Sequence, residues 1–214
     1  VFAKWTQAFS SKWIGYLDLQ VRNVKYEVVG QVAGPAPFTV DDQFSFFNPK
    51  AGVTYRASEA QRFFISFARA HREPNRTDYE NGNPVPEKLN DFEMGWRLQQ
   101  SNLQLQVNAY WMAYQDQLAL TGALDAVGNP IRENIGNSRR IGIEAEAKIP
   151  LAKQWLWQPN LALSRNENQD YFFERDGQLT HLGNTQLAFS PAVIAGNTLV
   201  FVPSTNFQVA ILSK

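Results

Sequence analysis

Apolar and polar residues alternate along most of this chain with a period of two. Over residues 103–113 the odd positions are apolar, whereas the even positions begin with Gln104 and Gln106. The same alternation runs over residues 141–149 and 92–98. Successive side chains of a β-strand point to opposite faces, so this period predicts strands with one apolar face and one polar face.

The alternation and its interruptions predict ten strands joined by connections of two kinds. The strands are expected at residues 1–8, 14–29, 44–56, 62–71, 88–99, 103–120, 131–150, 154–167, 185–202 and 206–214. The short connections are 9–13, 57–61, 100–102, 151–153 and 203–205, and the long ones are 30–43, 72–87, 121–130 and 168–184. Short and long connections alternate, so all short turns should lie at one end of the strands and all long loops at the other.

Strands of this length favour a membrane barrel over a soluble sandwich, whose strands are usually about five or six residues long. Outer-membrane barrels combine short turns at one end, long loops at the other, an apolar outer band and a polar interior. The chain has no apolar run of about 20 residues, so no membrane-spanning helix is expected. The fold class is therefore expected to be all-β, an antiparallel up-and-down transmembrane barrel.

Aromatic residues near the turns agree with this interpretation, because Trp and Tyr concentrate at the two membrane interfaces. The residues near short turns are Trp13, Tyr55, Phe63, Trp96, Trp155 and Trp157. A second girdle is expected at Trp111 and Tyr114, about ten residues beyond Asn102. Residues 115–117 should then protrude above the membrane.

Composition excludes several other classes of protein. The 214 residues include no Cys and two His, and 20 basic side chains balance 20 acidic ones. No disulfide framework or thiolate metal site is possible. Nucleic-acid binding is not expected, because no basic excess is present. The high apolar content, 44%, also argues against a disordered chain.

Five segments resemble the barrel half of TonB-dependent outer-membrane receptors. Their sequences are most similar to receptors of the Bacteroidetes type. They are residues 46–55 (FFNPKAGVTY), 63–76 (FFISFARAHREPNR), 86–95 (PEKLNDFEMG), 110–118 (YWMAYQDQL) and 134–146 (NIGNSRRIGIEAE). The resemblance covers about residues 44–214 in order and spacing.

The resemblance implies a 22-stranded barrel plugged by an N-terminal domain, which imports a scarce ligand with energy passed through the TonB complex. Residues 1–214 would be a partial barrel domain of such a receptor, without the plug, the TonB box, the early strands and the last strands. The implied location is the bacterial outer membrane, with membrane lipid and a small extracellular ligand as partners. A ferric siderophore is the first expectation, and cobalamin, a glycan or a peptide are others.

The loop at residues 72–87 holds the ligand-binding candidates. Arg72 and Arg76 offer guanidinium groups suited to carboxylate or phosphate, and Tyr79 adds an aromatic surface. In the resembling family such loops contact the ligand together with the plug. The alternative is that Arg72 and Glu73 pair with neighbouring strands while Pro74 shapes the loop.

Other charged residues are expected to have structural roles. Glu144, Glu146 and Lys148 should line the polar interior, with the glutamates paired to Lys148 or to arginines of neighbouring strands. Arg139 and Arg140 should form salt bridges in the wall. His71 and His181 lack the spacing of metal ligands. No catalytic set or cofactor motif occurs, so neither an enzyme nor a cofactor is expected.

Two further function classes stay open. A passive porin or a structural outer-membrane barrel would share the strand pattern but would bind no ligand tightly. A soluble, secreted β-rich module that binds glycans would instead bury the apolar face. The exposure of the apolar face distinguishes this last class from the membrane barrels.

Overall fold

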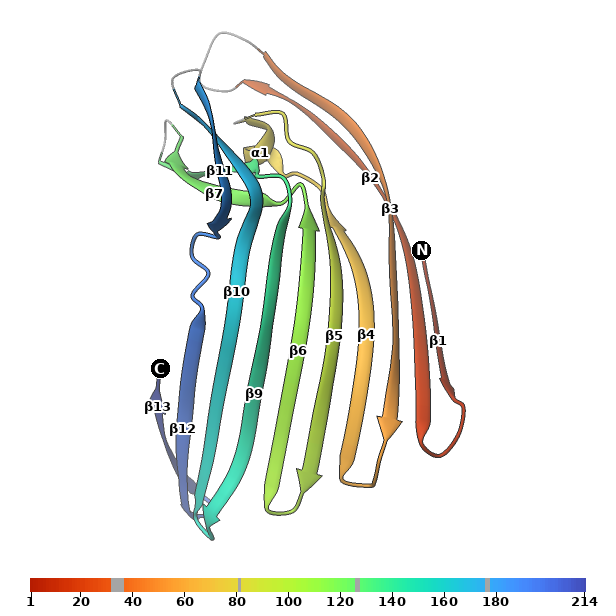
Figure 1. Ribbon diagram of the computed structural model, residues 1–214, viewed down its shortest axis with the longest axis vertical. Coiled ribbons are helices and arrows are strands. Elements are labelled where there is room, and N and C mark those ends of the chain that lie inside the picture. Colours follow the sequence, from red (N-terminus) through yellow and green to blue (C-terminus); the bar gives the residue numbers. More distant parts are fainter. Residues whose placement is uncertain (32–36, 81, 126–127, 176–177) are drawn as a thin grey trace.

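One curved antiparallel sheet forms most of the chain (Figure 1). The computed structural model describes residues 1–31, 37–80, 82–125, 128–175 and 178–214. The strands of the wall, in spatial order, are β1 (Phe2–Ala8), β2 (Trp13–Gln31), β3 (Pro37–Arg56), β4 (Gln61–Arg72), β5 (Glu87–Gln100), β6 (Leu103–Gln115), β9 (Ser138–Ala152), β10 (Trp155–Arg175), β12 (Val193–Ser204) and β13 (Phe207–Ser213).

Three strands and one helix lie outside this order. β11 (Gln178–Gln186) pairs with the upper part of β10, and β7 (Leu118–Leu124) pairs with β8 (Pro130–Asn134) in a separate two-stranded sheet. The helix α1 (Arg76–Glu80) lies between β4 and β5 in the sequence. The described part of the chain contains no helix that is long and apolar enough to cross a membrane.

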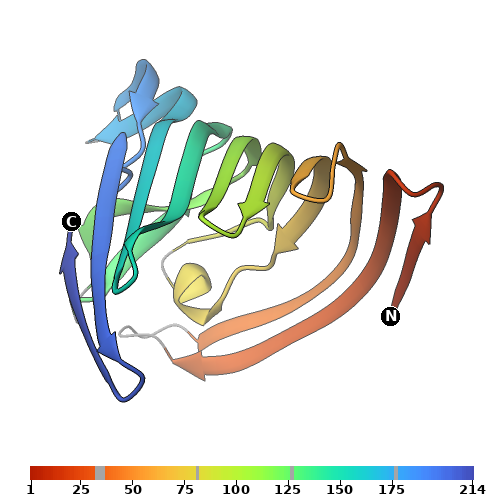
Figure 2. The same cartoon turned by 90° about the horizontal axis from the view of Figure 1, so that it is seen from below.

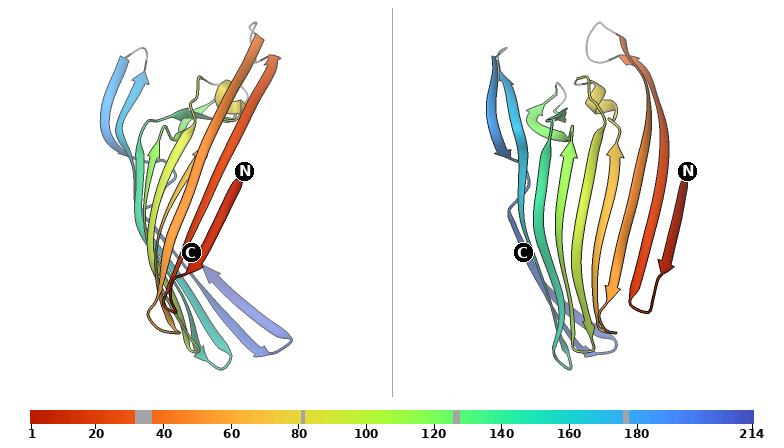
Figure 3. Two further views of the ribbon diagram at one scale, coloured as in Figure 1. Left: turned by 90° about the vertical axis from the view of Figure 1, so that its right-hand side faces the viewer. Right: turned by 45° about the vertical axis from the view of Figure 1, so that its right-hand side comes forward.

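The prediction of a two-ended wall is confirmed. The five short turns lie together at one end of the strands, and the described parts of the long connections lie at the other end (Figure 1). Two side views show that the β2–β3 hairpin reaches past its neighbours at the long-loop end (Figure 3). The predicted loops also include residues 32–36, 81, 126–127 and 176–177, which lie outside the described residues.

Three predicted strands each divide into two elements. Two others are longer than expected, because β3 begins at Pro37 rather than at residue 44 and β10 ends at Arg175 rather than at residue 167. The strand expected at 103–120 divides into β6 and β7 because Asp116 adopts a left-handed conformation, with φ of 51°. The strand expected at 131–150 divides into β8 and β9 at Gly136, whose φ is 75°. The strand expected at 185–202 divides between β11 and β12. In the first two cases one residue with positive φ turns the chain away from the wall, which the period-two pattern cannot show.

The apolar face of the wall is exposed on its convex side. Phe92 and Ile143 are 44% and 45% exposed. The concave side is identified by α1, which lies inside the curve (Figure 2) and contacts Tyr26 and Asp42. Direct cross-strand partners point to the same face, so the register carries this assignment from β2 to β12. A soluble module with a buried apolar face is therefore excluded.

The outward-facing residues of β6 are apolar from Leu103 to Trp111, which is about the length a tilted strand needs to cross a bilayer core. On β2 the outward residues change from apolar to polar after Val21, because Asn23 and Lys25 follow on the same face. The convex face thus carries an apolar band that ends below the long loops.

All six tryptophans point to the convex face by register. They are Trp5, Trp13, Trp96, Trp111, Trp155 and Trp157. The placement of Tyr114 in the outer girdle is wrong, because Tyr114 lies on the concave face with the Arg140 guanidinium 5.2 Å from its ring centre. Phe92 takes that place instead and stacks on Trp111 with ring centres 5.5 Å apart.

The best-buried residues lie at the long-loop end rather than inside the wall. Leu118 is 4% exposed, Ser138 is 0% exposed, and Pro74 and Gln117 are also buried. Residues 115–117 are expected to protrude above the membrane; they lie at the long-loop end, where Gln115 and Asp116 are exposed and Gln117 is buried. The long-loop end therefore contains a small packed core of its own.

Candidate functional site

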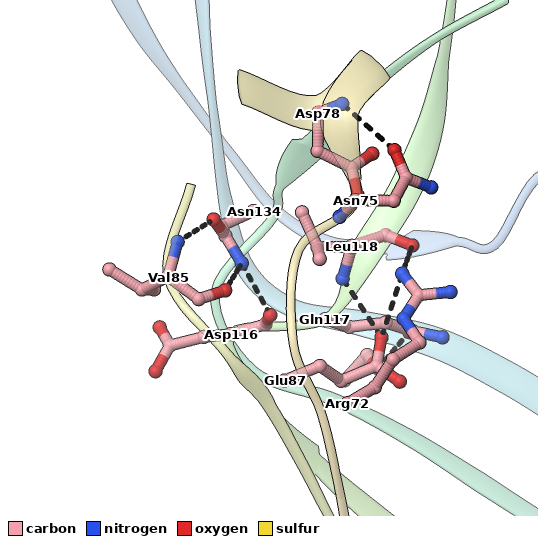
Figure 4. Close-up of polar contacts among 10 residues, drawn as sticks. Arg72, Asn75, Asp78, Val85, Glu87, Asp116, Gln117, Leu118 and Asn134 are labelled. Carbon is pink, nitrogen blue, oxygen red and sulfur yellow. Dashed lines mark hydrogen bonds and ion pairs between the residues drawn. The ribbon is translucent and has the colours of Figure 1, made fainter. Parts of the chain in front are cut away.

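The helix α1 begins with a reciprocal pair of hydrogen bonds. The side chain of Asn75 accepts from the backbone N–H of Asp78 at 3.1 Å, and the Asp78 carboxylate accepts from the N–H of Asn75 at 2.9 Å (Figure 4). Such a capping box satisfies N–H groups at the start of a helix. A single turn of helix is not stable alone, so tertiary contacts must hold α1 in place.

Tyr79 attaches α1 to the β2–β3 hairpin. Its ring stacks on Tyr26 with centres 5.4 Å apart, and its hydroxyl donates a 2.6 Å hydrogen bond to Asp42. Burial and this hydrogen bond raise the pKa of the Tyr79 phenol, which therefore stays protonated as the donor. The buried ring positions the helix, and ligand contact by Tyr79 stays a prediction.

Arg72 and Glu87 together hold the first residue of β7. The Arg72 Nη2 donates to the carbonyl oxygen of Leu118 at 3.3 Å, and the Leu118 N–H donates to the Glu87 carboxylate at 2.9 Å (Figure 4). The same Arg72 nitrogen lies 3.9 Å from Glu87. We call Arg72 and Glu87 the clamp, because they bind both backbone polar groups of one residue.

Further hydrogen bonds join the β7–β8 sheet to the loop that contains α1. The Asn134 side chain bridges three backbone groups: it accepts from the Val85 N–H at 2.8 Å and donates to the carbonyl oxygens of Val85 and Asp116 at 3.0 and 2.6 Å (Figure 4). Ser138 at the start of β9 donates to the side chain of Gln117. The two external segments therefore form one connected body over the concave side.

The wall has a seam between β3 and β4 near the long-loop end. The β3–β4 ladder runs from Arg56 only as far as Lys50, opposite Ala68. Beyond this point side chains bridge the two strands. His71 stacks on Phe46, with ring centres 5.1 Å apart, and its Nδ1 lies 2.8 Å from the side-chain oxygen of Asn48.

Arg22 crosses the same seam from β2. It forms an ion pair with Glu73 and donates to the carbonyl oxygen of His71 at 3.1 Å. Its guanidinium also lies 5.1 Å from the ring centre of Phe46. These contacts connect the β2–β3 hairpin to the start of the α1 loop.

A cavity of about 690 Å³ lies along this seam, against the concave faces of β2 and β3. We call it the basic groove. Its charged and titratable lining residues are Arg22, Lys50, Arg69, His71, Arg72, Glu73 and Arg76. Among these described residues, five carry a permanent positive charge and Glu73 alone is acidic. The volume lies within the range of small-ligand sites, and the charge favours an anionic ligand.

Arg76 lies at the rim of the groove with its side chain exposed. Its Nε donates a 2.6 Å hydrogen bond to Glu80 one turn further along α1, and this bond raises the pKa of the guanidinium. Arg72 and Arg76, predicted from the sequence, therefore line one cavity. Contact of either residue with a ligand stays a prediction.

The residues expected to line the interior lie lower on the concave wall. Glu144 and Glu146 are opposite Asn108 and Gln106 of β6, and Lys148 is opposite Gln104. No ion pair joins the two glutamates to Lys148 among the described residues. Arg139 and Arg140 are both expected to form salt bridges. Arg139 forms one with Glu167, with its Nη2 3.0 Å from the Glu167 carboxylate.

Sequence reasoning missed the part of the groove that belongs to the wall. Arg22 and Lys50 lie on the polar face of predicted strands, and this position was an available signal. Nothing local in the sequence shows that the β3–β4 ladder stops at Lys50. No cluster of metal-ligating side chains occurs among the residues that the structure describes.

The fold and the site define a segment of the wall of an outer-membrane β-barrel with structured external loops. Residues 1–212 match the family described as "TonB dependent receptor-like, beta-barrel". The chain belongs to this family of transport receptors. Its members are outer-membrane proteins of Gram-negative bacteria.

Curated relatives and solved structures agree with this family. The pesticin receptor of Yersinia enterocolitica is 30% identical over 123 residues, which are 58% of this chain and 17% of the relative. The pesticin receptor of Yersinia pestis is 29% identical over 127 residues, with the same coverage. These relatives are not Bacteroidetes proteins, so the likeness to Bacteroidetes receptors stays a prediction.

Two solved receptors show the same fold over nearly the whole chain. The ferric yersiniabactin uptake receptor of Yersinia pestis superposes with a TM-score of 0.72 and 18% identity, over 99% of this chain and 33% of that one. The closed form of a ferric-catecholate import receptor from E. coli K12 superposes with a TM-score of 0.68 and 16% identity, over 98% of this chain and 32% of that one. The chain thus spans about a sixth of the curated relatives and a third of these structures.

Proposed function

We propose that this chain is part of an outer-membrane receptor that binds an anionic metal chelate, such as a ferric siderophore, and imports it with energy passed through the TonB complex. The basic groove is the observation that carries the proposal. The groove is lined by residues at the long-loop end, next to the loop that contains α1, which is the end where we expect a ligand to arrive. The names of related receptors, which include ferric yersiniabactin and ferric-catecholate uptake, support the same ligand class.

The chemistry of the groove suits oxygen-rich anions. Guanidinium groups bind carboxylate and catecholate oxygens with charge-assisted hydrogen bonds. Arg22 is engaged by Glu73, and Arg72 and Arg76 approach Glu87 and Glu80. Lys50 is exposed at the foot of the seam, where an incoming ligand can reach it.

A deletion strain tests the transport proposal. Loss of the gene should abolish uptake of a ferric chelate under iron limitation, and deletion of TonB should have the same effect. Growth on defined iron and carbon sources would identify the chelate or reveal a nutrient instead. Uptake that persists without TonB would support a passive porin and contradict the proposal.

Exchange of single lysines on the concave wall tests the site. Lys50→Gln should weaken binding of the identified chelate by about tenfold in the complete receptor, because one charge-assisted contact contributes about 1.5 kcal/mol or more. Lys148→Gln removes the same charge on the same face, far below the groove, and should leave affinity unchanged. Titration of each variant with the iron-loaded and the iron-free chelate measures its affinity. Equal effects of the two substitutions would contradict a ligand site at the seam.

A further inference from the structure

Two arginines and one glutamate form a cluster on the convex face of β9 and β10, which are neighbouring strands (Figure 1). Register pairs Arg139 with Glu167 and Arg165 with Ile141. Their side chains therefore share a face with Ile141, which is 51% exposed, and with Leu163 further down β10. The cluster points outward, away from the basic groove and the interior.

Glu167 binds both arginines but cancels only one of their two positive charges. It accepts from Arg139 Nη2 at 3.0 Å and from Arg165 Nε at 2.5 Å, so the cluster keeps a net charge of one. The Arg165 side chain is 70% exposed. Among the described residues, Arg165 donates to Glu167 through its Nε. The two terminal nitrogens of the Arg165 guanidinium therefore remain available to a ligand.

The cluster lies at the upper border of the apolar band. Ile141 is opposite Trp111 on β6, in the register row where the outward-facing aromatic residues end. The next row up contains Arg139, and the row below contains Ile143 and Leu163. Aromatic rows of this kind mark the headgroup level of a membrane, so the arginines lie where lipid headgroups meet the protein.

We propose that Arg139 and Arg165 bind a phosphate group on a lipid headgroup in the outer leaflet, of the chemical class of a phosphorylated glucosamine glycolipid such as lipid A. A guanidinium fork matches phosphate oxygens in two hydrogen bonds. Glu167 fixes the orientation of Arg165 by holding its Nε. The apolar residues directly below the arginines favour a lipid over free phosphate, because they offer a surface to the acyl chains.

The test uses the full-length receptor in nanodiscs and native mass spectrometry, with hexa-acylated lipid A and the same lipid after enzymatic removal of its phosphates. Wild-type receptor should retain several-fold more lipid A than dephosphorylated lipid. Arg165→Gln should lower lipid A retention by about fivefold, which corresponds to about 1 kcal/mol per basic residue near a membrane surface. The wild-type comparison decides the proposal even where the variant does not fold.

The neighbouring residue Arg140 provides a matched control. Arg140→Gln removes the same charge from β9 but on the concave face, so lipid A retention should not change. Equal retention of both lipids by the wild type would overturn the proposal. So would equal losses in the Arg165→Gln and Arg140→Gln variants, or displacement of lipid A by millimolar inorganic phosphate.

Discussion

Three glycines of the concave face each lie under an aromatic side chain from the directly paired residue of the next strand. The pairs are Tyr16 with Gly52, Phe64 with Gly95 and Tyr110 with Gly142. A Cβ atom at Gly142 would lie 2.5 Å from the Tyr110 hydroxyl oxygen and 2.8 Å from the backbone carbonyl oxygen of Leu163. The absence of a side chain lets the ring lie flat against the backbone, and this arrangement recurs on alternate strand pairs of the curved wall.

Gly142→Ala should therefore destabilise the complete receptor by about 1 to 3 kcal/mol, because the added methyl group overfills the space beneath Tyr110. Urea-induced unfolding in lipid vesicles measures the change. Gly30→Ala is the control, since its Cβ would meet its nearest neighbour at an ordinary 3.8 Å. A neutral Gly142→Ala would show that the ring moves aside without cost.

The two faces of β6 give a second prediction at this scale. Val107 points to the convex face and Gln106 points to the concave face. Val107→Arg should cost about 2 to 4 kcal/mol in the complete barrel, since it places a charge near the middle of the bilayer, whereas Gln106→Arg should cost far less. Equilibrium unfolding of both variants provides the comparison, and equal costs would contradict the face assignment.

At the scale of elements, the external segments depend on long-range contacts rather than on their own propensity. Both α1 and the β7–β8 sheet are too short to be stable in isolation. The helix is attached through Tyr79, and β7 is held by the clamp of Arg72 and Glu87. Because Arg72 also lines the basic groove, one residue connects the candidate ligand site with the β7–β8 sheet.

Glu87→Ala should loosen the β7–β8 sheet without unfolding the barrel. The substitution leaves the Leu118 N–H without its acceptor, which costs about 1 to 3 kcal/mol for a buried donor. Hydrogen exchange of β7 and β8 should become about tenfold faster or more, with the wall strands unchanged. Glu144→Ala, lower on the concave wall, should leave the exchange of both elements as it is.

At the scale of the whole molecule, the two faces of the wall differ in their aromatic residues. Every tryptophan points to the convex face, and so does Tyr55 opposite Trp13, whereas Tyr16, Tyr26, Tyr110 and Tyr114 point to the concave one. An exposed apolar band of this kind is stable where hydrocarbon rather than water is the solvent. The concave side is polar and carries the groove.

Brominated lipids test this arrangement in the complete receptor. Trp111 is 49% exposed on the convex face, so its fluorescence should be quenched by bromine on the acyl chains. Trp111→Phe should remove a quenched component of the emission. If the emission lost with Trp111 is insensitive to brominated lipid, that part of the wall does not contact the bilayer.

The sequence by itself determined most strands of the wall, their two faces and the two ends of the wall. These features follow from the period of two and from the alternation of short and long connections, and both are local properties of the chain. The same reasoning placed Arg72 and Arg76 in an external loop, but it put Tyr114 on the wrong face, because an aromatic type alone does not report orientation.

Only the tertiary structure decided where the external segments go and what they meet. A positive φ at Asp116 turns β7 inward, and a ladder that stops at Lys50 opens the seam beside which Arg22 and Arg72 line one cavity. Each of these outcomes joins residues far apart in the sequence, so it depends on register and packing across several strands. Local pattern contains no information on such distant pairings.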